Sequence, residues 1–178
     1  RVEAGMALAN DLAAECLATV VMDFPGHGGR SQGAMTLHPE TKPMNSGEDF
    51  LSVDIVGSKN RVLQAMVDLS ILSEIIASDG LETAIDDDSN TDLFDYNSGG
   101  DIGYAGFSLG GFVGFPFATI DANVNVATFT GLGGRYSQVL TEGTLGGDIV
   151  SALEMAGLME GTFERFQALS FIQWIAEH

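Results

Sequence analysis

The chain has few basic residues, which argues against anionic partners, and a single cysteine, which excludes an internal disulfide. Its 178 residues include 25 Asp and Glu but only 7 Lys and Arg, so the formal charge is −18. Nucleic acids and anionic membrane surfaces are bound through Lys and Arg, so this composition argues against both as partners. Cys16 is the sole cysteine, which rules out a disulfide within the chain, and its apolar helical surroundings predict a small core residue.

Long apolar runs are also missing. No stretch reaches the length of about 18 consecutive apolar residues that a membrane-spanning helix needs. Four prolines, 23 glycines and 45% apolar residues are typical of a globular domain with many tight turns. The chain opens at Arg1, shows no signal peptide and runs directly into a helical pattern, so either its front has been removed or it is part of a longer chain, and we favour the second.

The spacing of apolar residues predicts alternating helices and strands. The predicted helices are 2–15, 61–77, 109–119, 148–159 and 162–177. The predicted strands are 17–24 (LATVVMDF), a run that ends at Phe107, and 124–131. This alternation predicts an α/β fold in which parallel strands are covered by helices on both faces.

The turn between a predicted strand and a predicted helix carries the motif G-x-S-x-G, from Gly106 to Gly110. A serine at such a turn has a strained backbone, which holds its hydroxyl away from the sheet. Side chains at Gly106 and Gly110 would collide with the neighbouring strand and helix. The helix would direct N–H groups, including that of Leu109, at an oxyanion forming beside Ser108. The alternative is a glycine-rich turn with an ordinary capping serine.

A second motif, DFPGHGGRS, follows the predicted strand 17–24 and begins at Asp23. It resembles the D-x-P-G-H-G-x-S loop that many α/β-hydrolases carry ahead of the strand that leads into the nucleophile elbow, which is the name of their G-x-S-x-G turn. With the G-x-S-x-G turn, it makes the chain similar to the α/β-hydrolase superfamily, and more narrowly to bacterial extracellular lipases and esterases. The narrower resemblance uses looser features: Asn60-Arg61 with Gln64 and Asp68, an acidic loop before the elbow, and Gly131, Gly133 and Gly134. Phe107 departs from those lipases, which commonly have histidine there.

The resemblance implies a fold and an activity. Residues 1–178 would be the central part of an α/β-hydrolase domain, with 132–178 as a helical cap or lid. Ser108 would be the catalytic nucleophile that forms an acyl-enzyme, and Leu109 an oxyanion-hole donor. The substrate would be a small-molecule or lipid ester, with no cofactor and no metal. A secreted or cell-surface location is implied by the resemblance only.

The sequence does not clearly supply the catalytic base and acid that Ser108 would need. Histidine follows serine and acid in this family, so His27, which precedes Ser108, is expected to be structural. His178 closes an apolar helical run, although the family's histidine lies in a loop, and neither Asp121 nor Asp148 is well placed as the acid. The second oxyanion donor would precede Arg1. We therefore expect little turnover from this segment alone.

An acidic loop, IDDDSNTDLFD at 85–95, alternates oxygen side chains as calcium ligands do. The alternating residues are Asp86, Asp88, Asn90 and Asp92. Thr91 stands at the sixth position, where calcium loops have glycine, and Asn97 at the twelfth, where they have glutamate. A solvated acidic loop is therefore favoured over a calcium site.

Two further functions remain open from the sequence. The same elbow would serve a thioesterase, peptidase or acyltransferase, because a fold does not fix the substrate. A non-catalytic binding module with a degenerate site is the second alternative. The sequence does not indicate an oligomeric state.

Overall fold

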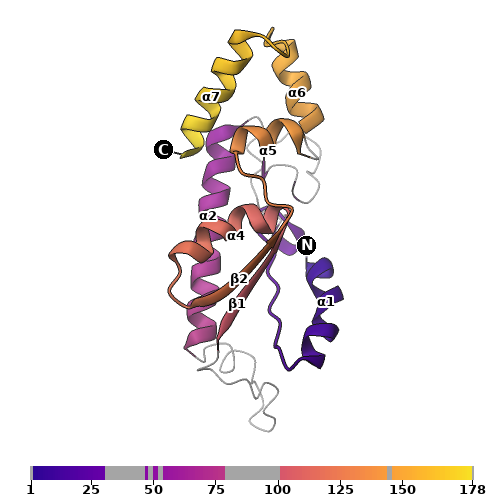
Figure 1. Cartoon of the computed structure of the whole chain (residues 1–178), viewed down its shortest axis with the longest axis vertical. Coiled ribbons are helices and arrows are strands. Elements are labelled where there is room, and N and C mark those ends of the chain that lie inside the picture. Colours follow the sequence, from indigo (N-terminus) through magenta and orange to yellow (C-terminus); the bar gives the residue numbers. More distant parts are fainter. Residues whose placement is uncertain are drawn as a thin grey trace. The chain divides into compact units, whose positions relative to one another are not determined.

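The computed structural model of the chain describes residues 2–30, 47, 50–51, 54–78, 101–143 and 146–177. Within them, six α-helices, one short 3-10 helix and two strands form (Figure 1). In chain order they are α1 (Val2–Ala14), η1 (Gly28–Arg30), α2 (Ile55–Ala77), β1 (Ile102–Phe107), α4 (Leu109–Ile120), β2 (Val124–Thr130), α5 (Tyr136–Glu142), α6 (Gly146–Met155) and α7 (Phe163–Glu177). The chain divides into two compact units, the helical unit (Arg1–Leu63 with Gly133–His178) and the elbow unit (Gln64–Leu132).

The predicted α/β fold, with the central sheet of an α/β-hydrolase, is wrong. The described residues contain only a two-stranded parallel sheet, β1 with β2, and helices dominate. Residues 17–24 form no strand, and Leu17 and Val20 are exposed. A β-branched apolar run becomes a strand only where another strand supplies the hydrogen-bonding ladder, and local composition does not encode that partner.

Most of the other predicted elements are confirmed. The helix predicted at 2–15 is α1, the helix at 61–77 lies within α2, and the strand–helix–strand series from Phe107 onward is β1, α4 and β2. Helix α2 begins earlier than predicted, at Ile55, because the Asp54 carboxylate accepts the Gly57 N–H at 2.9 Å and caps the helix.

The C-terminal helices differ in their bounds from those predicted. Helix α6 ends at Met155 because Gly157 takes φ +82° and the Leu158 N–H donates to the Leu153 carbonyl at 2.9 Å. This is a glycine-dependent helix stop that the apolar pattern does not reveal. Helix α5, in the glycine-rich stretch after β2, was not predicted.

Cys16 is exposed, contrary to the expected core position. It follows α1 with φ 60°, and the N–H of Leu17 donates to the Leu12 carbonyl at 3.0 Å. This is the left-handed turn that commonly ends a helix, with cysteine where glycine is usual. The turn takes Cys16 out of the helical register from which burial was predicted.

In the elbow unit, α4 covers one face of the sheet (Figure 1). The ring of Tyr104 on β1 lies 5.5 Å from that of Phe117 on α4 and 6.0 Å from that of Phe129 on β2. The rings of Phe115 and Phe129 lie 5.6 Å apart. Successive side chains of a strand point to opposite faces, so Phe107 lies on the face of the sheet opposite to Tyr104 and Gly106. The Phe107 side chain is 75% exposed.

In the helical unit, α5 packs against α6 and α7, and buries Tyr136 and Leu140. The backbone N–H of Ser137 donates to the Gln173 side-chain oxygen at 3.0 Å, which ties α5 to α7. Lys59 on α2 donates to the carbonyl of Ile175 at 3.2 Å. Polar contacts therefore fix α7 at two points.

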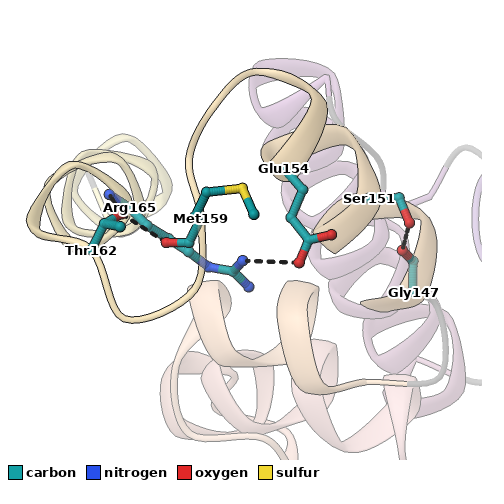
Figure 2. Close-up of polar contacts among 6 residues, drawn as sticks. All are labelled: Gly147, Ser151, Glu154, Met159, Thr162 and Arg165. Carbon is teal, nitrogen blue, oxygen red and sulfur yellow. Dashed lines mark hydrogen bonds and ion pairs between the residues drawn. The ribbon is translucent and has the colours of Figure 1, made fainter.

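Helices α6 and α7 are joined by a buried cation. Arg165 points from α7 toward α6, and its Nη1 lies 3.9 Å from the Glu154 carboxylate (Figure 2). The Thr162 hydroxyl donates to the Met159 carbonyl at 2.7 Å in the connection between the helices (Figure 2).

Four aromatic residues of α7 are 54–67% exposed: Phe163, Phe166, Phe171 and Trp174. The role of 132–178 as a cap or lid stays a prediction.

Candidate active site

Ser108 forms the one-residue turn between β1 and α4. Its backbone angles, φ 52° and ψ −113°, are rarely adopted by residues other than glycine. Among the described residues, only Cys16 shares a positive φ without being glycine. The Ser108 N–H donates to the Thr130 carbonyl at 2.8 Å, and its own carbonyl accepts the Phe112 N–H at 3.0 Å. The strained turn is therefore held by β2 on one side and by α4 on the other.

The side chain of Ser108 is exposed and makes no capping hydrogen bond with α4. A serine that serves as a helix cap normally accepts a backbone N–H from the first turn of the helix. The first N–H groups of any helix, here those from Leu109 onward, have no acceptor within the helix. An exposed hydroxyl and a set of N–H donors thus meet at one helix end, and the geometry disfavours an ordinary capping serine.

Gly106 packs directly against the first turn of α4. A Cβ at position 106 would lie 2.6 Å from the Gly110 carbonyl oxygen and 2.9 Å from the Gly111 Cα. At position 110 the nearest atom to a Cβ would be the Tyr104 hydroxyl oxygen, at an ordinary contact distance of 3.9 Å. The close approach of strand and helix therefore depends on Gly106 and leaves room at Gly110.

Tyr104, on β1, contacts α4 through both its hydroxyl and its ring. Its hydroxyl donates to the Gly110 carbonyl at 2.7 Å. Its ring occupies the space that a side chain at Gly114 would need. Burial raises the pKa of Tyr104 to about 12, so its hydroxyl keeps the proton and donates at neutral pH.

The end of β2 lies beside the serine. A Cβ at Gly131 would lie 3.7 Å from the Ser108 nitrogen and 3.8 Å from Cε2 of Phe107. A Cβ at Gly111, in the first turn of α4, would lie 3.7 Å from that of Leu132. Two exposed apolar side chains, Phe107 at 75% and Leu132 at 39%, therefore flank the turn that presents Ser108.

Asp121 serves the opposite end of α4. Its carboxylate accepts the Ser73 hydroxyl at 2.9 Å and the Asn123 N–H at 3.0 Å. The 12 residues of α4 separate it from Ser108, and they rise about 18 Å. Asp121 is a helix cap and lies too far away to act as the acid for Ser108. Residues 64–132 contain no histidine.

His27, in the helical unit, is packed among aromatic rings. Its ring lies 5.2 Å from that of Phe50 and 6.5 Å from that of Phe24, and its Nδ1 lies 3.2 Å from the Pro25 carbonyl oxygen. The Gly47 N–H donates to the Gly26 carbonyl at 2.8 Å in the same cluster. The structural role of His27, expected from its place ahead of Ser108, stays a prediction.

Several predicted groups lie outside the described residues. They are Asp86, Asp88, Asn90 and Asp92 of the acidic loop, His178, and the side chain of Asp148. Where the structure does describe the chain, no three His, Cys, Asp or Glu side chains gather as metal ligands. None of the described helices has both the length and the hydrophobicity to cross a membrane.

Tyr104 and Gly114 are not among the site residues predicted from the sequence. Their signal is positional: Tyr104 lies two residues before Gly106, on the same face of β1, and Gly114 lies one helical turn after Gly110. A bulky residue on the strand face opposite two glycines on a helix face indicates close packing of the two elements.

Comparisons of the chain with protein-family models, with curated proteins and with solved structures find no match. These comparisons give no support to the resemblance to α/β-hydrolases, which stays a prediction from two short motifs. What the structure adds is local geometry: an exposed serine, strained and rigidly held, at the N-terminus of a helix.

Proposed function

We propose that the protein is a serine carboxylic-ester hydrolase with Ser108 as its nucleophile. The observation that carries this proposal is the backbone of Ser108, held at φ 52° and ψ −113° between β1 and α4 with its side chain exposed. Backbone strain of this kind costs about 1–3 kcal/mol and clusters at functional sites. A turn that only connected a strand to a helix would be more stable with glycine at this position.

The geometry supports acyl transfer through the serine. The Ser108 Oγ would attack the ester carbonyl carbon and form a tetrahedral intermediate, whose oxyanion would accept the N–H of Leu109. The proton from Oγ would pass through a general base to the departing alcohol, and water would then release the acid from the acyl-serine. The elbow unit offers the nucleophile and the oxyanion donor, but no histidine base.

The apolar residues that flank Ser108 favour esters with an apolar acyl group. Phe107 and Leu132 are both exposed near the turn. Covering apolar surface contributes about 25 cal/mol per Å², so an acyl chain of several carbons would gain more from this surface than an acetyl group.

Fluorophosphonate labelling tests the nucleophile. We expect the probe to label the full-length wild-type protein and Ser108→Ala to abolish labelling while the far-UV circular dichroism is retained. Ser151→Ala is the control, because Ser151 is another exposed serine, here inside α6, with its hydroxyl donating to the Gly147 carbonyl at 2.8 Å (Figure 2). This control should label like the wild type.

Two results would overturn the assignment. Labelling that persists in Ser108→Ala would place the reactive group elsewhere. Full-length wild-type protein that does not react with the probe would favour the non-catalytic binding module.

A further inference from the structure

The first half of α4 is intrinsically a poor helix. Gly110, Gly111 and Gly114 all lie within it, and glycine is less favourable in a helix than alanine by about 1 kcal/mol per residue. Pro116 has no N–H to donate to the carbonyl four residues earlier. The turn that carries the Leu109 N–H thus needs support from outside the helix.

Tyr104 provides support of this kind. Its hydroxyl donates to the Gly110 carbonyl at 2.7 Å, so a side chain of β1 is bonded to the second residue of the helix. Its ring is fixed by Phe117, Phe129 and the bare backbone of Gly114. The hydroxyl is therefore held by a side chain that has little freedom to move.

We propose that Tyr104 is a positioning residue for the reaction at Ser108, which acts through the Gly110 carbonyl on the first turn of α4. This inference rests on the proposed ester hydrolase function. Ser108 connects β1 to α4, so the hydrogen bond from Tyr104 on β1 to the Gly110 carbonyl on α4 fixes the angle between the two elements. That angle sets the direction of the Leu109 N–H relative to the Ser108 hydroxyl.

A positioning role differs from simple stabilisation in what it changes. Removing the Tyr104 hydroxyl leaves the ring and its packing in place, and the Ser108 side chain is not touched by the substitution. The first turn of α4 becomes freer to move, so fewer molecules hold the N–H donors where the oxyanion forms. The rate of covalent reaction at saturating probe should fall, while binding of the probe should not.

The test compares Tyr104→Phe with Tyr136→Phe in the full chain. Tyr136 is buried where Tyr104 is half-buried, burial raises the pKa of both, and Tyr136 lies in the helical unit. Fluorophosphonate labelling is measured against probe concentration to separate kinact from KI. For Tyr104→Phe we expect kinact to fall roughly three- to tenfold, the effect of losing one hydrogen bond, with KI unchanged. In Tyr136→Phe both constants should match the wild type.

Hydrogen exchange gives a readout that does not depend on activity. Amides of residues 109–114 should exchange faster in Tyr104→Phe than in the wild type or in Tyr136→Phe. Wild-type kinact in Tyr104→Phe would overturn the positioning role and leave Ser108 as the nucleophile. An equal loss of kinact in both variants would also overturn it, because the cause would then be general stability. A wild-type chain that is not labelled removes the reaction, and the positioning role with it.

Discussion

Replacing Gly106 with alanine is expected to destabilise the protein by about 3 kcal/mol or more, or to prevent the elbow unit from folding. The added Cβ would lie 2.6 Å from the Gly110 carbonyl oxygen, 2.8 Å from its carbonyl carbon and 2.9 Å from the Gly111 Cα. All three are backbone atoms, so no side-chain rotation relieves the clash. Either β1 and α4 separate, which uncovers the rings packed between them, or the strained turn at Ser108 is lost. Urea unfolding followed by circular dichroism measures the effect.

Gly134→Ala is the control for the loss of a glycine. Gly134 has open space where a Cβ would be added, and its φ is not positive. We expect a change of less than about 0.5 kcal/mol there, as for most surface substitutions. Equal urea midpoints for Gly106→Ala and Gly134→Ala would contradict the close contact of β1 with α4.

Gly114→Ala is expected to have the second largest effect on stability, with a net loss of about 1–3 kcal/mol. The ring of Tyr104 occupies the position of the new Cβ, and this ring is held by Phe117 and Phe129. Relief of the clash requires the ring to move, which also breaks the hydrogen bond to the Gly110 carbonyl. Thermal unfolding of the variant gives the net loss.

Gly110→Ala separates this clash from helix propensity. Both positions lie in α4, and at both alanine favours the helix by about 1 kcal/mol over glycine. A Cβ at Gly110 would meet only the Tyr104 hydroxyl oxygen, at 3.9 Å. Gly110→Ala should therefore unfold at the wild-type temperature or above it, and Gly114→Ala well below it. Similar unfolding temperatures for the two variants would show that Tyr104 does not pack over Gly114.

The elbow could be predicted from sequence because its signals are local. An apolar run, a G-x-S-x-G turn and a helix follow one another between Ile102 and Ile120, and the strand that pairs with β1 is the next element along the chain, β2. The structure adds the backbone angles of Ser108 and the unequal space at Gly106 and Gly110, which depend on how strand and helix approach each other.

The sheet could not be predicted in the same way. Residues 17–24 have the composition of a buried strand, but a strand is completed by a partner that is remote in sequence. Cys16 shows the same limit on a smaller scale, since a turn of one residue with φ 60° carries it out of the predicted helix and into solvent. Periodicity describes the faces of an element and not the neighbours that cover them.

Trapping the acyl-enzyme tests the central claim most directly. The full chain is mixed with a p-nitrophenyl ester of a medium-chain acid, quenched in acid, digested and mapped by tandem mass spectrometry. The account predicts that the acyl group is found on Ser108, and that Ser108→Ala shows no acylated peptide. An acyl group on a different residue, or acylation of Ser108→Ala to the same extent as the wild type, would contradict it.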